Sequence, residues 1–96
     1  MNIGEITCGN FLLHNYFRIT GRGLAVAGKI TGGSIAADNF ISVCQVLVKI
    51  KSIEFVRVPG GELTGLILDI AESNWIETQL DKLKGQTLSI IADEVS

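Results

Sequence analysis

The residues best suited to chemistry lie in the glycine-rich stretch ITGRGLAVAGKITGG, residues 19–33. A phosphate-binding loop has the form G-x-x-x-x-G-K-[ST], and Gly23, Gly28 and Lys29 match it. The next residue is Ile30, where the loop needs a hydroxyl for magnesium. The dinucleotide-binding fingerprint fails as well, because its third glycine is missing. Both motifs must open a helix, and ITGGS after the lysine cannot continue one. We therefore expect this chain to bind no nucleotide and no other cofactor.

The same glycines fit a structural role in turns and strands. Gly21 and Gly23 flank Arg22 between two extended segments, where a hairpin turn favours positive φ. Gly28 lies inside a strand pattern, where glycine marks a bend or the close approach of another backbone. Gly33 belongs to the following turn. We interpret these glycines as the residues that allow a strand to fold back twice.

No set of side chains has the composition of a catalytic or metal site. His14 is the only histidine, and no second His or Cys stands at ligand spacing from it. Glu62, Asp69 and Glu72 show no spacing that pairs an acid with a base. We expect neither enzymatic activity nor a metal ion.

Five side chains form a candidate nucleic-acid surface. His14, Tyr16 and Arg18 alternate along one strand, and Lys49 and Lys51 point outward from another. Aromatic rings and cations on a barrel face are what single-stranded nucleic-acid binders use for stacking and phosphate contact. The alternative is an ordinary outer face, where β-propensity favours the same residues. The net charge of −2 favours that alternative.

The elements that would position these residues are mostly strands, because the apolar period is two over most of the chain. A change of face near Ser52 predicts a bulge or a sharp bend. Short strands with glycine-rich turns favour a closed antiparallel β-barrel of about six strands in a single domain, residues 1–96. The expected strands cover residues 11–20, 24–31, 40–43, 46–58, 63–70 and 87–92.

One segment, near residues 74–84, has the spacing of a helix instead. Ile76, Leu80 and Leu83 lie at i, i+4 and i+7. Asn74 can cap the first turn and Gly85 can end the last one. The pattern predicts one short helix.

The bulk composition indicates a cytoplasmic protein. Hydrophobic residues make up 47% of the chain, yet no apolar run reaches the roughly 18 residues of a membrane helix. The start MNIGEITCGN lacks the order of a secretion signal. Cys8 and Cys44 do not make a disulfide framework, so we expect both thiols to be reduced.

The spacing of the glycines resembles a known family. Residues 17–43 look like the opening of domain 2 of the translation GTPases, the β-barrel of elongation factor Tu and its relatives. Three later segments resemble the same domain in the same order, so the likeness covers about residues 11–92. They are VKIKSIEF (48–55), GGELTGLILDI (60–70) and LKGQTLSI (83–90).

That resemblance implies a β-barrel, and in the family this domain meets ribosomal RNA or the aminoacyl end of tRNA. The chain departs from the family pattern at Ala27, usually Thr, at Asp38, in a glycine turn, and at Asp69, where elongation factor Tu has a basic residue. The 96 residues contain no GTPase domain, so GTP binding and hydrolysis are not implied.

The interior of a small barrel has room for only some of the apolar residues of this chain. Those expected inside are Leu24, Val26, Ile30, Val46, Val48, Ile50, Leu66, Leu68 and Ile70. Leu12, Leu47, Ile67 and Trp75 then have no interior place. Trp75 lies about 100° around the helix from Ile76, so it either caps a barrel end or anchors an interface.

We accordingly expect a non-catalytic binding or assembly module that acts mainly by protein–protein interaction. A weak-to-moderate homodimer with Trp75 at or beside the contact, joined by Leu12 and Ile67, is the specific prediction. The alternative is RNA or ribosome binding.

Overall fold

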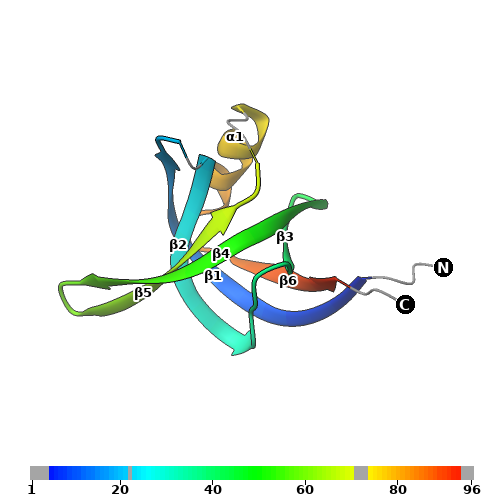
Figure 1. The fold of residues 1–96 in the computed structure, drawn as a ribbon, viewed down its shortest axis with the longest axis horizontal. Helices are drawn as coiled ribbons and strands as arrows, with labels where there is room; N and C mark the ends of the chain where they lie inside the picture. The colour runs from blue at the N-terminus through cyan, green and yellow to red at the C-terminus, as the bar shows by residue number, and fades with distance from the viewer. Residues whose placement is uncertain (1–4, 22, 71–73, 94–96) are drawn as a thin grey trace.

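The computed structural model describes residues 5–21, 23–70 and 74–93, which form one closed barrel and one helix (Figure 1). The strand order around the barrel is β1-β2-β5-β4-β3-β6, and all neighbours are antiparallel. The predicted class, an all-β barrel of six strands with one short helix, is confirmed. The elements are β1 (Glu5–Ile19), β2 (Gly23–Gly33), β3 (Phe40–Val43), β4 (Val46–Val58), β5 (Gly61–Leu68), α1 (Asn74–Leu83) and β6 (Thr87–Asp93).

The glycine cluster serves the fold, as the sequence predicted. Gly21 and Gly23 have φ of 79° and 96° in the β1–β2 turn, and Gly33 has φ of 65° where β2 ends. Arg22 lies outside the described residues. Gly28 lies within β2, and a Cβ there would overlap the carbonyl oxygen of Leu12 in the neighbouring strand. Two strands therefore approach each other at Gly28 more closely than any side chain allows.

The core lies inside the barrel and is entirely apolar among the described residues. Six of the nine expected interior residues are fully or almost fully buried, and Ile70 packs against the cluster half-buried. The prediction is wrong for Ile30 and Val46, since both side chains are exposed. Ile30 lies beyond Gly28, where the pairing of β2 with β5 ends, and Val46 directly follows the β3–β4 turn.

The pairing of the described strands shifts register at four places, and two of these shifts bear on the sequence predictions. The shift between Ile50 and Ser52 confirms the bend that was expected near Ser52. The shift in β1 between Leu13 and Asn15 was not expected. Leu13 is buried before it, whereas Tyr16 packs against the core after it and Phe17 is 49% exposed. The bulge thus reverses which residues of β1 face inward.

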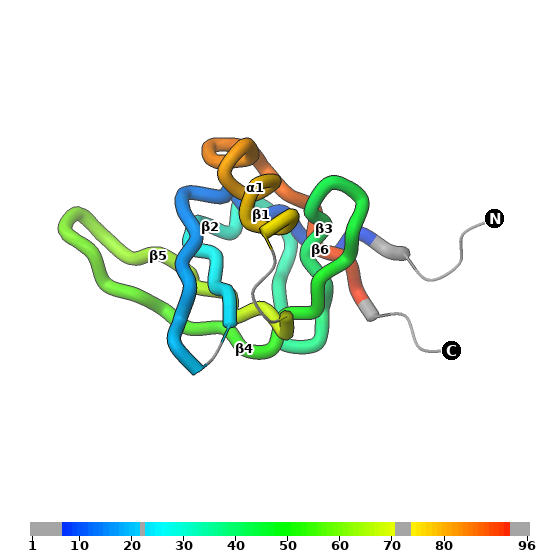
Figure 2. Tube along the Cα trace, turned by 90° about the horizontal axis from the view of Figure 1, so that it is seen from above, coloured from blue at the N-terminus to red at the C-terminus, as the bar shows by residue number. Residues whose placement is uncertain are grey.

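The helix α1 covers one end of the barrel, in contact with β1 and β3 (Figure 2). Ile76 and Leu80 are buried in the core cluster, and Leu83 packs against it. Just after the helix in the chain, the N–H of Gly85 donates to the carbonyl of Leu13 at 2.7 Å. No helix in the described segments is long and apolar enough to span a membrane.

The hairpin of β4 and β5 projects from the barrel as a two-stranded arm, residues 55–64 (Figure 1, left). The pairing of β5 with β2 ends at Thr64, opposite Gly28. The pairing of β5 with β4 continues to the Val58–Gly61 pair. This projection is in keeping with a molecule that measures 43 × 28 × 23 Å.

Candidate functional site

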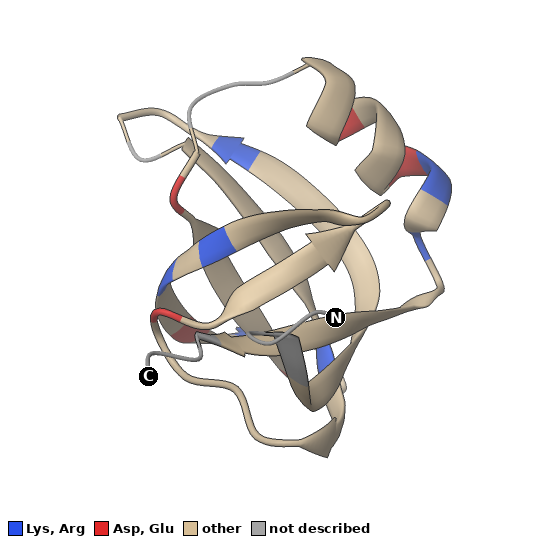
Figure 3. Cartoon of the chain, turned by 90° about the vertical axis from the view of Figure 1, so that its right-hand side faces the viewer, with Lys and Arg blue, Asp and Glu red and all other residues tan. Residues whose placement is uncertain are grey.

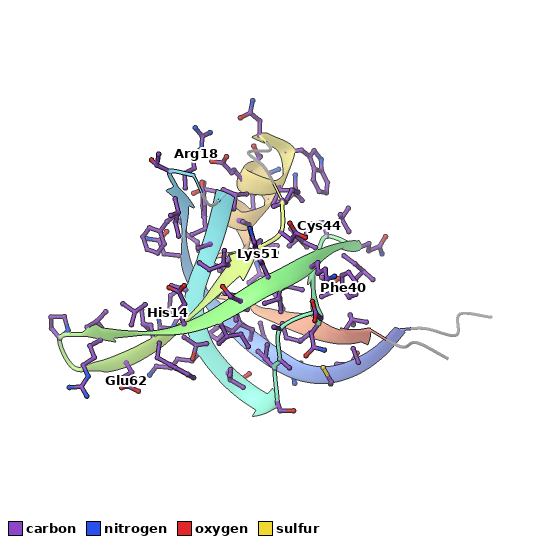
Figure 4. All side chains as sticks on the ribbon, viewed as in Figure 1. His14, Arg18, Phe40, Cys44, Lys51 and Glu62 are labelled. Carbon is purple, nitrogen blue, oxygen red and sulfur yellow. The ribbon has the colours of Figure 1, made fainter. Side chains whose placement is uncertain are left out.

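The structure does not bring the five candidate nucleic-acid residues together. His14, Tyr16 and Arg18 belong to β1, whereas Lys49 and Lys51 belong to β4. Two other strands separate β1 from β4 along either route around the barrel. Within β1, Arg18 lies beside α1, and His14 lies toward the base of the arm (Figure 4). The set is divided between different sides of the molecule.

Three of these side chains make contacts within the chain. Arg18 donates from Nε to both carboxylate oxygens of Glu77 at 2.9 Å, and Glu77 is among the acidic residues that α1 carries (Figure 3). The Lys84 ammonium lies 5.3 Å from the centroid of the Tyr16 ring, within range of a cation–π interaction. Lys49 pairs with Asp38 at 3.5 Å. Tyr16 and Arg18 therefore help to attach the helix to β1.

The expected interface residues differ in their accessibility. Ile67 is only 3% exposed, so its expected place on the surface is wrong. Its strand is flanked on both sides, and Ile67 pairs with Ala25 of β2 and Ser52 of β4. Leu12 is half-buried. Trp75 is 49% exposed and is therefore available to a partner.

Trp75 lies on the side of α1 that faces the β3–β4 turn. Cys44 in that turn donates from Sγ to Oε1 of Gln79 at 3.3 Å (Cys44 is labelled in Figure 4). Gln79 is one helical turn after Trp75, so both side chains project from the same side of the helix. Val46 follows the turn and is exposed. We call Trp75 and Val46 the helix patch.

Both cysteines in the described segments are free. Cys8 is partly buried and its Sγ lies 3.6 Å from Oδ1 of Asn39. Asn39 also accepts from the backbone N–H of Ala36 at 2.8 Å. The preceding residue, Asp38, has φ of 75°, a conformation that Asp tolerates better than most residues. These contacts define the loop before β3.

The arm exposes apolar groups that sequence reasoning did not single out. Phe55 is 72% exposed and Val56 is 45% exposed. The two are consecutive in a strand, so they lie on opposite faces of the arm. Arg57 and Glu62 approach across the two strands of the arm at 3.9 Å. The signal in the sequence was the blurred alternation after Ser52, where apolar residues occupy both faces.

Two surface depressions are lined by described residues. One, of about 450 Å³, lies along α1 and is lined by Tyr16, Asn74, Glu77, Thr78, Asp81 and Lys82. The other, of about 240 Å³, lies between the arm and the pair His14 and Lys29. The described residues include no group of three or more His, Cys, Asp or Glu side chains that could hold a metal ion.

The helix patch and the arm thus both expose large apolar side chains, as does Phe17 on β1. No protein-family model, no curated protein and no solved structure matches this chain. Its function is therefore inferred from these surfaces and from the charges around them.

Proposed function

We propose that this chain is a non-catalytic protein-binding module of the cytoplasm, a relative of the second domain of translation factors. Its helix patch is the binding site. The observation that carries the proposal is the half-exposed Trp75 on the side of α1 that faces the β3–β4 turn, the turn after which Val46 is exposed. Tryptophan is enriched among the residues that dominate protein–protein binding energy, because its large ring loses much water-exposed area in a contact.

The surroundings of the patch suit a protein partner better than a nucleic acid. Arg18, the cation of β1 nearest the helix, is bonded to Glu77, and the net charge of the chain is −2. Binding to phosphate backbones depends on free Lys and Arg that release counterions. An apolar patch with polar surroundings is typical of the centre and rim of a protein interface.

The proposal is tested by replacing Trp75 with Ser and following the partners retained from the source cells. Phe17→Ser is the matched control, because Phe17 is also 49% exposed but lies on β1 after the bulge. Loss of a large buried anchor costs about 2 kcal/mol or more, so we expect at least about a 30-fold loss of affinity for Trp75→Ser only. Trp75 is the only tryptophan, so its emission should shift to shorter wavelength when the partner is added.

Equal retention of every protein by Trp75→Ser and Phe17→Ser would contradict the proposal. So would retention that disappears when the extract is treated with ribonuclease, since the alternative function, RNA or ribosome binding, predicts that result.

A further inference from the structure

Strand β4 has a neighbouring strand on only one of its two edges along the arm, among the described residues. On one side β4 pairs with β5 from Ile50 to Val58. On the other side it pairs with β3 only from Val46 to Lys49. Ile50 closes that side, because its N–H and carbonyl bond to Asn39 and Asp38 at 2.8 Å. From Ser52 to Val58, no strand in the described parts of the chain pairs with this edge.

This edge has only part of the usual protection against pairing with another chain. Natural edge strands are shielded by Pro, by charged side chains, especially Lys, by bulges or by extreme shortness. Here the bulge at Ile50–Ser52 and Pro59 lie just outside the segment, and the charged side chains within it are Glu54 and Arg57. The segment SIEFVRV is seven residues long and mostly apolar, and Phe55 is its most exposed large apolar side chain. The edge is thus extended, bounded at both ends and suited to strand addition.

We propose that the occupant of this edge is a second copy of the chain, paired antiparallel about a two-fold axis at Phe55. A two-fold axis normal to a sheet pairs residues that lie equally far before and after the axis. The midpoint of Ser52–Val58 is Phe55, so overlap of the full segment places the two Phe55 rings side by side. The other pairs are Glu54 with Val56, Ile53 with Arg57 and Ser52 with Val58.

The charges of the segment agree with this register. No two like charges lie opposite each other, which would destabilise a pair of strands. Arg57 of one copy lies diagonal to Phe55 of the other, within reach of a cation–π contact. Moving the two-fold axis one residue toward the barrel would set Glu54 against Glu54. An unrelated extended peptide could add to the edge, but nothing in the segment specifies its side chains, whereas the copy matches it in length, centre and charge.

Sedimentation equilibrium from micromolar to hundreds of micromolar concentration measures the association. We expect a dimer that Phe55→Lys weakens by at least about 30-fold, because two Lys side chains would then meet at the axis. Phe17→Lys, which adds the same charge outside the edge, should leave the dimer intact. Trp75→Ser should leave it intact too, since the helix patch is a separate surface. Phe55 is exposed, so circular dichroism should show all three variants folded.

Cysteine cross-linking tests the register independently of affinity. In a background with Cys8→Ser and Cys44→Ser, Phe55→Cys should form a disulfide-linked dimer under mild oxidation, because residues directly opposite in a ladder have Cβ atoms about 5 Å apart. Val58→Cys should not, because its partner across the axis is Ser52.

Four outcomes would overturn the proposal. They are a monomer at hundreds of micromolar, a dimer unaffected by Phe55→Lys, a dimer lost in Trp75→Ser, and equal cross-linking of the two cysteine variants. Because these measurements use the purified chain alone, they succeed or fail independently of the partner expected at the helix patch.

Discussion

Two glycines on adjacent strands differ in the space that surrounds them. At Gly28 of β2, an added Cβ would overlap the carbonyl oxygen of Leu12 and lie 3.1 Å from the Phe11 ring. At Gly65 of β5, the nearest atom would be the carbonyl oxygen of Glu54 at 3.5 Å, an ordinary contact. Neither has positive φ. Space alone therefore distinguishes them.

We expect Gly28→Ala to lower the free energy of unfolding by about 2–3 kcal/mol, the cost of forcing an extra methyl into packed backbone. Gly65→Ala, the control, should change it by less than about 1 kcal/mol, since the methyl finds room and the unfolded chain loses freedom. Urea denaturation of both variants measures the difference. Similar stabilities for the two would show that β1 can move away from β2 at little cost.

Sequence reasoning identified Gly28 correctly because a glycine inside a strand pattern is a local signal. It placed Ile67 wrongly because the burial of that residue depends on other strands. Ile67 pairs with Ala25 of β2 and Ser52 of β4, which are distant in sequence. A local sequence pattern predicts the conformation of a segment. To predict which residues of a sheet are buried, the order of its strands must also be known.

At the level of elements, α1 is the part whose stability depends most on docking. A ten-residue helix is too short to be stable alone in water. Its apolar stripe, predicted from the spacing of Ile76, Leu80 and Leu83, is the one that meets the core. The helix was predictable because its period differs from that of every other segment.

Leu80→Ala should lower the free energy of unfolding by about 3 kcal/mol, because Leu80 is fully buried and its loss leaves a cavity. Thr78→Ala is the control on the exposed side of the same helix and should change stability by less than about 0.5 kcal/mol. Thermal unfolding followed by Trp75 fluorescence and by far-ultraviolet circular dichroism measures both. A Leu80→Ala protein as stable as Thr78→Ala would show that α1 contributes little to the core.

The arm could be anticipated only in part. The strands around the PGG turn were predicted, but not their extension beyond the barrel, because that depends on where β2 stops pairing with β5. The apolar residues Phe55 and Val56 were therefore assigned to an ordinary strand. The candidate surfaces proposed here consequently include one residue, Trp75, that sequence alone suggested and an edge that it did not.

For the molecule as a whole, the distribution of charge opposes RNA binding. The cations of the candidate set lie on separate strands, and Arg18 and Lys49 are paired with Glu77 and Asp38. The five residues looked like one surface in the sequence because alternation fixes sides only within a strand. Which strands are neighbours is set by the closure of the barrel.

We expect no complex with single-stranded RNA tighter than about 10⁻⁵ M at physiological salt, which is near the non-specific level. Fluorescence anisotropy with labelled oligonucleotides measures it. A submicromolar complex that weakens steeply with salt and is abolished by Arg18→Glu together with Lys51→Glu would reverse this expectation.

The position of β6 between β1 and β3 has a consequence for folding during synthesis on the ribosome. Residues 87–93 are synthesised after the other five strands of the barrel, yet they supply both remaining seams of the barrel and the core residues Leu88 and Ile90. While they are still inside the ribosome, the emerged part of the chain cannot close the barrel. The nascent protein then exposes the edges of β1 and β3 in addition to that of β4, a form open to aggregation until the last strand emerges.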